Sequence, residues 1–413
     1  MNPDERRRAE AAFAAEPDCV IVATSTLELG LDVGDLDRVV QIDAPGTVSS
    51  FLQRMGRTGR RVGTRRNCLT LATSTEALMI ALGIGRLWRD GYVETILPPP
   101  SPLHIFAQQV LALVLQESGI ARGDWPWWLG DALTGADHTS EEEVIAHMLA
   151  TGILVEDAGI LGIGPEGEAK FGRRYFQELV AAFTTPLLLA VRYGGNDLGS
   201  IDPLSLESQR TSVPVILLGG RSWRVLDVDW TRRTVSVEPA AEVGRSRWFG
   251  SSRALHADLA HSVERVLTTG ESGVTLSSRA QASLAGLCEE MPYLDGESLL
   301  VVSTGDEVRI WAFAGGRANA MLASALQSGG GTLRSVDNFG VTLREMDKAT
   351  LDAALDSISD ENCRVPVDPR MLAELKFGAC LPEKLAHDVL RLRLSDFGAL
   401  HHCLQRSRRW INP

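Results

Sequence analysis

Short aliphatic and β-branched runs recur in the first part of the chain and alternate with stretches of helical periodicity. The run at residues 19–23 is too short and too β-branched for a helix, so it predicts a buried strand, and the short runs at 39–43 and 69–72 predict two more. Residues 4–15 carry charged side chains on one side and apolar ones on the other, which indicates a helix. Strands that alternate with helices are typical of a parallel sheet, so we expect an α/β domain over residues 1–97.

A proline-rich linker at residues 96–102 ends this pattern, because its four prolines fit neither a helix nor a strand ladder. Periodic apolar residues then predict helices at 103–117 and 139–150, the second opening with hydroxyl and acidic residues suited to a helix start. Two short strands within 153–163 flank an Asp-Ala-Gly turn and predict a hairpin. Helices followed by a small hairpin indicate a winged-helix domain over residues 101–183. Its neighbouring tryptophans, which we expect in the core, are Trp125, Trp127 and Trp128.

The pattern changes again in the second half of the chain. Short strands at 187–191, 213–218 and 223–228 are separated by glycine-rich and polar turns, which predicts a small barrel or sandwich. We expect this β-barrel-like module over residues 184–252 and a C-terminal α/β region over 253–413. The predicted fold class is therefore an α/β domain, a winged helix, a β-rich module and a further α/β region.

Composition and charge restrict the class of protein only modestly. The 413 residues are 44% hydrophobic and 23% charged, which is typical of a globular protein. No apolar run reaches the roughly 18 residues that a membrane span needs, and the N-terminus has no signal-peptide core, so we expect a cytoplasmic protein without a membrane partner. The formal net charge of −12 argues against a surface coated with cations, although nucleic acid needs only a locally basic face.

The six cysteines are scattered and form no CxxC pair, so the sequence indicates neither a zinc site nor a disulfide framework. The residues His401, His402 and Cys403, together with Cys380, could be interpreted as metal ligands. We favour the simpler interpretation that they are buried or incidental residues, and we expect no metal site formed by them.

Two segments near the N-terminus carry residues suited to phosphate chemistry. Residues 23–32 follow a predicted strand, and residues 53–60, with the sequence Gln-Arg-Met-Gly-Arg-Thr-Gly-Arg, come about twenty residues later. We expect Arg57 and Arg60, at positions i and i+3, to project from one face at the start of a helix. The guanidinium group keeps its charge and its planar fork matches phosphate oxygens, so such arginines can stabilise charge that develops on a γ-phosphoryl group.

These segments resemble motifs V and VI of superfamily 2 helicases, in the same order and at similar spacing. The resemblance implies that residues 1–97 are part of the second RecA-like domain of such a helicase. Motif V would contact the nucleic-acid backbone through Thr24 and Ser25, and would couple to the nucleotide through Gly30 and Asp32. Motif VI would supply a nucleotide-side glutamine and two arginine fingers, which are Gln53, Arg57 and Arg60.

The sequence lacks the motifs that would complete a nucleotide site. It contains no GxxxxGK[ST] P-loop and no DEAD or DExH box. The segment 315–317 lacks the lysine and the spacing, and the GxGxxG pattern at 162–167 follows a predicted hairpin and contains Pro165. The resemblance therefore implies ATP and Mg²⁺ only in a composite site, shared with an N-terminal RecA-like domain that this sequence lacks. We expect no ATP hydrolysis by the chain alone.

Later phrases make the chain similar to the large helicase-related (Lhr) branch of these helicases. The matching phrases are residues 24–30, 217–225 and 313–319. This resemblance implies an ATP-dependent 3′-to-5′ helicase or translocase that acts on single-stranded DNA or an RNA–DNA hybrid and serves DNA repair. The chain would be its C-terminal portion and would work with a separate or missing N-terminal half. A non-enzymatic nucleic-acid-binding remnant and a truncated product of a longer helicase gene stay open as alternatives.

Aromatic and basic residues interleave in the β-rich part. Trp230 is followed by two arginines, and Trp248 follows Arg245 and Arg247. Single strands bind to aromatic platforms beside a cationic track, but a tryptophan core with solvated arginines fits the same pattern. Within the resembled family a tryptophan of this region stacks on a base, which keeps Trp230 and Trp248 as candidates for strand binding.

Overall fold

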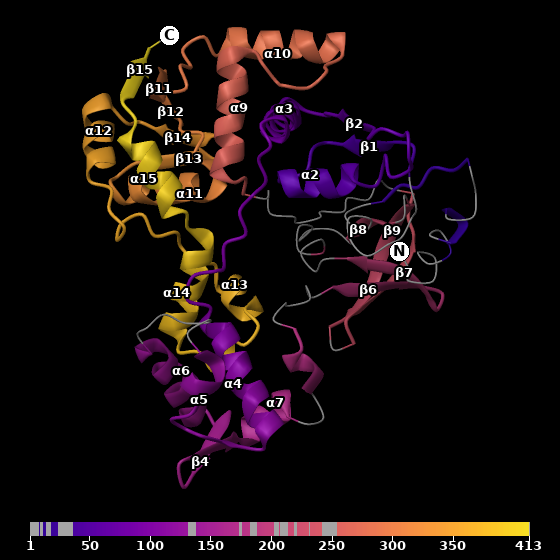
Figure 1. The fold of residues 1–413 in the computed structure, drawn as a ribbon, viewed down its shortest axis with the longest axis vertical. Coiled ribbons are helices and arrows are strands. Elements are labelled where there is room, and N and C mark those ends of the chain that lie inside the picture. Colours follow the sequence, from indigo (N-terminus) through magenta and orange to yellow (C-terminus); the bar gives the residue numbers. More distant parts are fainter. Residues whose placement is uncertain are drawn as a thin grey trace. The chain divides into compact units, whose positions relative to one another are not determined.

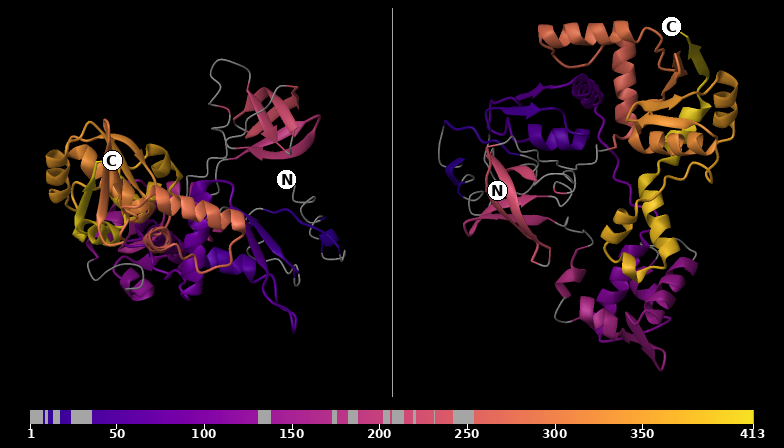
Figure 2. Two further views of the ribbon diagram at one scale, coloured as in Figure 1. Left: turned by 90° about the horizontal axis from the view of Figure 1, so that it is seen from above. Right: turned by 180° about the vertical axis from the view of Figure 1, so that it is seen from behind.

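The computed structural model describes residues 8, 11–13, 18–23, 36–130, 138–172, 176–181, 188–201, 206, 214–218, 221–230, 232–241 and 254–412 (Figures 1 and 2). The chain divides into two compact units, each built from two segments that are far apart in the sequence. Unit 1 joins Met1–Glu94 to Pro186–Pro292, and unit 2 joins Thr95–Thr185 to Tyr293–Pro413. The boundaries of the four consecutive domains expected above stay a prediction.

Two parallel strands and two helices form the α/β part of unit 1. Strand β1 (Val39–Ile42) pairs with β2 (Cys68–Leu71) without a register shift, from Val39 opposite Cys68 to Ile42 opposite Leu71. Helix α2 (Val48–Met55) follows β1, and helix α3 (Thr75–Arg89) follows β2. Parallel neighbours need a crossover connection, and α2 lies within it. The alternation of strands and helices predicted for this part of the sequence is confirmed from β1 to α3.

The predicted strand at residues 19–23 is not a strand in the structure. The run has no regular secondary structure, and the side chains of Val20 and Val22 are 92% and 93% exposed. A β-branched run becomes a strand only where a neighbouring strand takes up its backbone hydrogen bonds. In the described residues β1 pairs with β2 alone, so the run has no partner strand. Of the helix predicted at 4–15, residues 11–13 are helical and most of the others lie outside the described residues.

Helix α3 packs against α9 (Ala257–Thr269), which belongs to the second segment of unit 1. Leu82 of α3 is buried in a small apolar cluster with side chains of α9 and of α10 (Ser278–Glu290). A Cβ added to Gly83 would lie 2.7 Å from a methyl group of Val263, so the glycine permits the close approach of the two helices.

The β-rich part of unit 1 is one five-stranded sheet. Its strands are β6 (Leu189–Tyr193), β7 (Asn196–Ile201), β8 (Val215–Leu218), β9 (Arg221–Asp229) and β10 (Thr234–Pro239). They are ordered β7-β6-β10-β9-β8, with β6 parallel to β10 and the other pairs antiparallel. Trp223 of β9 lies in the core of the sheet, and its Nε1 donates to the carbonyl of Leu218 at 3.0 Å. This tryptophan is a core residue.

The first segment of unit 2 is mostly helical. Its elements are α4 (Leu103–Glu117), β3 (Ile120–Ala121), α5 (Trp125–Leu129), α6 (Thr139–Ala150), β4 (Leu154–Asp157), β5 (Ile160–Ile163), α7 (Pro165–Phe171) and the 3-10 helix η3 (Phe176–Leu179). The strands form an antiparallel sheet in the order β3-β5-β4. The predicted helices at 103–117 and 139–150 and the predicted hairpin are confirmed.

A segment from near the C-terminus completes the core of these helices. It consists of α13 (Pro369–Glu374), the 3-10 helix η4 (Gly378–Cys380) and α14 (Glu383–Leu394). Leu385 and Val389 are buried in the same cluster as Phe106 of α4. Phe377 stacks obliquely on Phe171 with ring centroids 5.4 Å apart. The helical core of unit 2 therefore depends on residues more than two hundred positions away in the sequence, which the sequence pattern did not indicate.

The second segment of unit 2 also contains an α/β sheet (Figure 2). Its elements are β11 (Leu299–Thr304), β12 (Glu307–Trp311), α11 (Gly315–Ser328), β13 (Thr332–Val336), β14 (Gly340–Arg344), α12 (Lys348–Asp356), α15 (Phe397–Gln405) and β15 (Arg408–Ile411). The strand order is β13-β14-β12-β11-β15, with β15 parallel to β11. Helix α11 packs on β13 and β14 and contacts α12 and α15. This confirms mixed helices and strands in the C-terminal region.

Of the three tryptophans expected in the helical core, Trp125 alone is buried. Its ring packs on Phe106 with centroids 4.9 Å apart, and its Nε1 donates to Glu142 Oε1 at 3.1 Å. Trp127 and Trp128 are 78% and 42% exposed and contact each other. The expectation was wrong for these two because neighbouring residues of a helix point in different directions.

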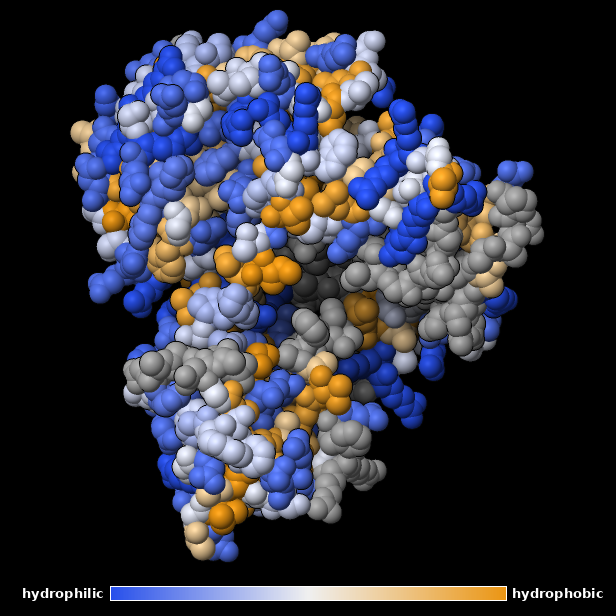
Figure 3. All heavy atoms as spheres, in the orientation of Figure 1, coloured by the Kyte–Doolittle hydropathy of each residue, from blue (hydrophilic) through white to orange (hydrophobic). Residues whose placement is uncertain are grey.

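The molecular surface, the lengths of the helices and the positions of possible metal ligands place few further constraints on function. On the face drawn in Figure 3, hydrophobic side chains lie in small groups among hydrophilic ones, as on most protein surfaces. In the described part of the chain, no helix is long and apolar enough to span a bilayer. No group of three His, Cys, Asp or Glu side chains suited to a metal ion occurs there either, and Nε2 of His401 lies 3.0 Å from Oδ1 of Asp360.

Candidate functional site

Helix α2 carries Gln53, the first of the predicted motif VI residues, and is capped twice at its first turn. Oγ1 of Thr47 accepts a hydrogen bond from the backbone N–H of Ser50 at 3.2 Å. The carboxylate of Glu94 accepts from the N–H of Val48 at 2.5 Å and from that of Ser49 at 2.9 Å. Burial raises the pKa of Glu94, but these backbone hydrogen bonds outweigh it and hold the pKa below its usual value. The start of α2 is therefore tied to the chain that follows α3.

Arg57 and Arg60 lie beyond the end of α2, not at the start of a helix. The helix ends at Met55, and Gly56 is its C-cap. Gly59 then has φ +69°, a left-handed conformation that no helix continues. The expectation that both arginines share one face of a helix start was wrong, because the two glycines end the helix before the first arginine and turn the chain before the second.

Thr58 and Gly59 fasten the turn between the two arginines. The side chain of Thr58 is 1% exposed, and its Oγ1 donates to the carbonyl of Met55 at 2.9 Å and accepts from the N–H of Asn67 at 2.9 Å. A Cβ at position 59 would lie 2.6 Å from the backbone nitrogen of Arg66, so glycine alone fits there. The turn is thus held to α2 on one side and to the segment leading into β2 on the other.

The three predicted motif VI side chains lie close together in the sequence but differ in exposure. Gln53 on α2 and Arg60 after the turn are exposed, whereas Arg57 is half-buried. Nε of Arg60 donates to the carbonyl of Gly56 at 2.9 Å, which holds the guanidinium near its own turn. Two permanently charged groups on a fastened turn are suited to face a phosphate.

A buried polar network beneath α2 was not predicted. Nε2 of Gln41 on β1 donates to Sγ of Cys68 on β2 at 3.1 Å, and Nη1 of Arg54 on α2 donates to Oε1 of Gln41 at 3.4 Å. Burial raises the pKa of Cys68, so the thiol stays protonated. The available signal was a single glutamine inside the aliphatic run of β1. The network joins both strands to the helix that precedes the arginines.

Seven of the predicted site residues lie outside the described residues, and these are Thr24, Ser25, Gly30, Asp32, Arg245, Arg247 and Trp248. Trp230 lies in the turn between β9 and β10 and is 57% exposed. The backbone N–H of Arg232 donates to Oδ1 of Asp229 at 2.8 Å, which shapes this turn. Trp230 is therefore a surface residue with basic neighbours, in contrast to the buried Trp223.

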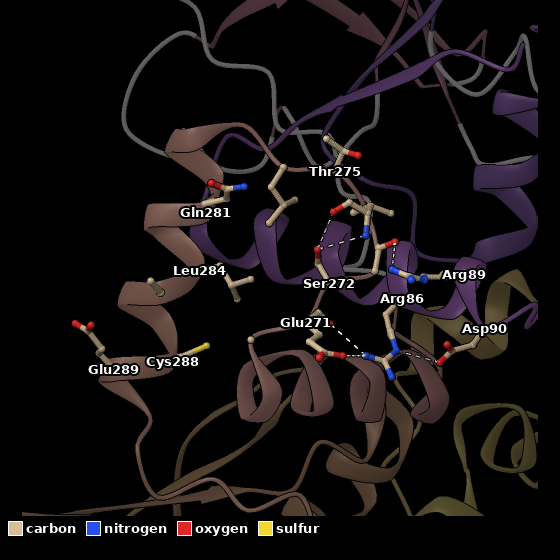
Figure 4. Close-up of a pocket in the computed structure, with 15 residues that line it drawn as sticks. Arg86, Arg89, Asp90, Glu271, Ser272, Thr275, Gln281, Leu284, Cys288 and Glu289 are labelled. Atoms are coloured by element: carbon tan, nitrogen blue, oxygen red, sulfur yellow. Dashed lines mark hydrogen bonds and ion pairs between the residues drawn. The ribbon is translucent and has the colours of Figure 1, made fainter.

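A cleft of about 1000 Å³ lies elsewhere in unit 1, between the end of α3, the loop before α10 and α10 itself (Figure 4). Arg86 contacts Asp90 at 3.2 Å and Glu271 at 3.6 Å, and Nη1 of Arg89 donates to the carbonyl of Gly273 at 3.2 Å. Both arginines of the cleft are engaged by groups of the same chain. The cleft includes none of the predicted site residues, and we assign no ligand to it.

Comparisons with known proteins connect these features to one family. The Helicase conserved C-terminal domain matches residues 1–62. The chain is 25% identical over 367 residues to an Lhr helicase/uracil glycosylase of Escherichia coli, which covers 75% of this chain and 22% of that protein. It is 27% identical over 319 residues to an Lhr helicase/probable uracil glycosylase of Mycolicibacterium smegmatis, which covers 71% of this chain and 20% of that protein. The chain thus spans about a fifth of the length of these relatives.

A solved structure of Mycobacterium smegmatis helicase Lhr bound to ssDNA and AMP-PNP has a similar fold. It superposes with a TM-score of 0.60 at 17% identity and covers 100% of this chain and 59% of that one. At this identity the likeness concerns the fold alone. Together with the residues of motif VI in α2 and in the turn after it, these similarities show that the chain resembles a C-terminal helicase region of the Lhr-like family.

Proposed function

We propose that this chain forms one wall of a composite ATP site in a 3′-to-5′ helicase or translocase. Arg57 and Arg60 act as arginine fingers, Gln53 contacts the nucleotide, and Gly30 and Asp32 couple the nucleotide to the bound strand. The remaining contacts come from an N-terminal RecA-like domain with a P-loop and an acidic box. Residues 53–60 contain no carboxylate, so motif VI would supply no ligand to Mg²⁺, which prefers oxygen ligands, and the acidic box of the other domain would hold the ion.

The fastened turn is the observation that carries this proposal. A finger lowers the barrier to phosphoryl transfer only if its charge is already in place when charge develops on the phosphate. Thr58 and Gly59 restrict the backbone between the two arginines, and the caps at Thr47 and Glu94 hold the helix before them. Such a rigid support suits a group that must be preorganised.

The nucleic acid in this proposal is single-stranded DNA or the strand of an RNA–DNA hybrid. Thr24 and Ser25 of motif V contact its backbone, Arg245 and Arg247 neutralise phosphates, and Trp230 or Trp248 stacks on a base. The exposed ring of Trp230, in the same turn as Arg232 and Arg233, supports the last role, because aromatic faces next to cations bind single strands with little sequence preference. The M. smegmatis Lhr of similar fold was solved with ssDNA.

The accessory parts are assigned by their element order. We propose that residues 101–183 form a winged helix, since α4, β3, α6 and the β4–β5 hairpin follow one another and the strands pair as β3-β5-β4. Residues 184–252 are the β-barrel-like module, and 253–413 are the C-terminal α/β region that completes an exit path for the strand. Residues 1–97 are the partial RecA-like domain.

Steady-state ATP hydrolysis, with and without single-stranded DNA, tests the proposal. The chain alone should show no turnover, because it lacks the lysine and acidic residues that hold the phosphates and Mg²⁺. Adding an N-terminal helicase half should restore hydrolysis, and Arg57→Ala or Arg60→Ala should then lower the rate by roughly 10³–10⁵-fold. Arg65→Ala, which removes an exposed arginine of the same loop, is the matched control and should keep the rate. Full activity in both finger variants would disprove the assigned roles.

The second candidate function is that of a non-enzymatic protein that binds single strands. The exposed ring of Trp230 supports this function as much as it supports strand binding by a helicase. Measurements on the chain with its N-terminal half bound distinguish the two functions. If this complex binds single-stranded DNA but does not hydrolyse ATP, the second candidate function is supported.

A further inference from the structure

Two neighbouring tryptophans on the short helix α5 are exposed. Trp125 is 1% exposed and packs on Phe106 in the core, whereas Trp127 and Trp128 are 78% and 42% exposed. Successive residues of a helix lie about 100° apart around its axis, so Trp127 lies on the side of α5 opposite to Trp125. The rings of Trp127 and Trp128 contact each other edge to face, with centroids 4.9 Å apart. We call these two side chains the tryptophan pair.

The tryptophan pair belongs to a helical turn that the rest of unit 2 holds in place. The backbone N–H groups of Trp127 and Trp128 both donate to the carbonyl of Asp124, at 3.0 and 3.2 Å. The buried ring of Trp125 anchors the same turn, because its Nε1 donates to Glu142 of α6. Tryptophan is among the residues that most often dominate the binding energy of protein interfaces. A ring that is already ordered also loses little conformational entropy when a partner covers it.

The segment that carries the tryptophan pair is strongly acidic. Residues 101–157 contain nine Asp and Glu residues and a single Lys or Arg, which is Arg122. The segment therefore has a formal charge of −8, against −12 for the whole chain. Arg122 is itself engaged, because it forms ion pairs with Glu156 at 2.8 Å and with Glu142 at 3.6 Å. The segment has no further lysine or arginine to balance its other carboxylates.

Carboxylates from three neighbouring elements surround the start of α5. Asp124 precedes α5, Glu143 lies in α6 and Asp157 ends β4, and all three are exposed. The ion pairs of Arg122 bring α6 and β4 to this place. Glu141 of α6 adds a carboxylate that is 3% exposed, and its Oε2 has no hydrogen-bond partner in the residues that the structure describes. The surroundings of the tryptophan pair therefore attract cations.

These two properties together restrict the chemistry of a partner. A nucleic-acid strand can stack on tryptophan, but the carboxylates repel its phosphates. A purely apolar partner would use the rings and leave the carboxylates without counter-charges. Lysine and arginine side chains suit both properties, because they bind over the face of a tryptophan ring and pair with carboxylates.

We propose that the tryptophan pair and the carboxylates beside it form a docking surface for a basic segment of a second protein. Lysine or arginine side chains of that segment lie over the rings of Trp127 and Trp128. The inference does not rest on the ATP site, and it adds a protein partner to the proposed function. It also assigns protein binding and strand binding to different parts of the chain, because α5 belongs to unit 2 and Trp230 belongs to unit 1.

Fluorescence anisotropy of a labelled peptide of alternating arginine and glycine residues, titrated with the full chain, tests the docking surface. The peptide should bind, and its affinity should fall with rising salt because the attraction is partly electrostatic. Trp127→Ala and Trp128→Ala should each weaken binding about two- to fivefold, as expected for an exposed cation–π contact, and the double variant by about tenfold. Trp230→Ala removes an exposed tryptophan of unit 1 and should bind the peptide like the unaltered chain.

Charge variants separate the docking surface from the general attraction of an acidic protein for a basic peptide. Glu143→Gln and Asp157→Asn should each weaken peptide binding by about twofold, as expected for an exposed ion pair. Glu290→Gln makes the same change of net charge at the end of α10 in unit 1, and it should leave the affinity unchanged. All the substituted side chains are exposed, so thermal melts should show that every variant keeps the fold.

Three results would overturn the inference. The first is a peptide that does not bind, or that binds the double tryptophan variant as tightly as the unaltered chain. The second is a labelled single-stranded oligonucleotide whose affinity falls in the double variant as much as in Trp230→Ala, which would assign the tryptophan pair to the strand. The third is self-association of the chain, measured by light scattering, that the double variant abolishes, which would assign the surface to a second copy.

Discussion

Thr58→Val tests whether the hydroxyl of Thr58 fastens the turn between the two arginines. The side chain is 1% exposed, and valine has nearly the same shape, so the change removes a hydroxyl without opening a cavity. Two hydrogen bonds are lost, one to the carbonyl of Met55 and one from the N–H of Asn67, each 2.9 Å long. At about 0.5–1.5 kcal/mol for each bond, the turn should open more easily by about 2 kcal/mol.

Amide hydrogen exchange measures this opening at the residue that loses its acceptor. If the turn opens locally, about 2 kcal/mol corresponds to roughly 30-fold faster exchange of the Asn67 N–H. Thr58→Ser keeps the hydroxyl and is the matched control, so its Asn67 exchange should stay within about threefold of the unaltered chain. Exchange in Thr58→Val that also stays within that range, or equal acceleration in both variants, would refute the argument that the hydroxyl holds the turn.

Two further substitutions test the surface and the core. Trp230→Ala should weaken binding of a labelled single-stranded oligonucleotide by about 1–3 kcal/mol through lost stacking, with an unchanged melting temperature. Trp223→Ala should lower the free energy of unfolding by about 3–5 kcal/mol, because it removes a buried ring. Fluorescence anisotropy measures the affinity for the oligonucleotide and thermal melting measures the stability. Equal losses of affinity or equal losses of stability in the two variants would contradict these assignments. Burial, aided by the charge of Arg393, lowers the pKa of His104 from 6.5 to about 4. The unfolded chain therefore takes up the proton first, and stability should fall as the pH drops below 6.5 towards 4, by about 2 kcal/mol at pH 5. Urea denaturation at pH 7 and pH 5 should show a smaller loss in His104→Leu, and an equal loss would exclude His104 as the cause.

Regular elements were predictable wherever neighbouring residues decide them. The helices at 103–117 and 139–150, the strands near 39–43 and 69–72, and the hairpin within 153–163 follow from apolar periodicity and turn chemistry. These signals are local because backbone hydrogen bonds of a helix or a hairpin join residues that are close in sequence. Strands of a parallel sheet also need a partner from elsewhere in the sequence. The strands β1 and β2 pair with each other, whereas the run at 19–23 has no partner strand among the described residues.

The candidate site was predictable as a set of residues but not as a geometry. The spacing of Gln53, Arg57 and Arg60 is contained in eight consecutive residues, so the resemblance could select them. The place where α2 ends depends on Gly56 and on the positive φ of Gly59, and the pattern of charges alone suggested a helix start instead. The carboxylate of Glu94, which caps α2, lies 46 and 45 positions from the residues it binds, and no local sequence pattern indicates this contact.

The sequence by itself determined which faces of the chain must be covered, because apolar side chains at a fixed period require burial. Only the tertiary structure decided what covers them. Residues 369–394 enter the core formed by α4 and α6, Trp127 and Trp128 stay outside it, and Val40 and Ile42 stay 52% and 72% exposed. The physical reason is that burial depends on the partner across the contact, whereas periodicity records one side of the contact alone.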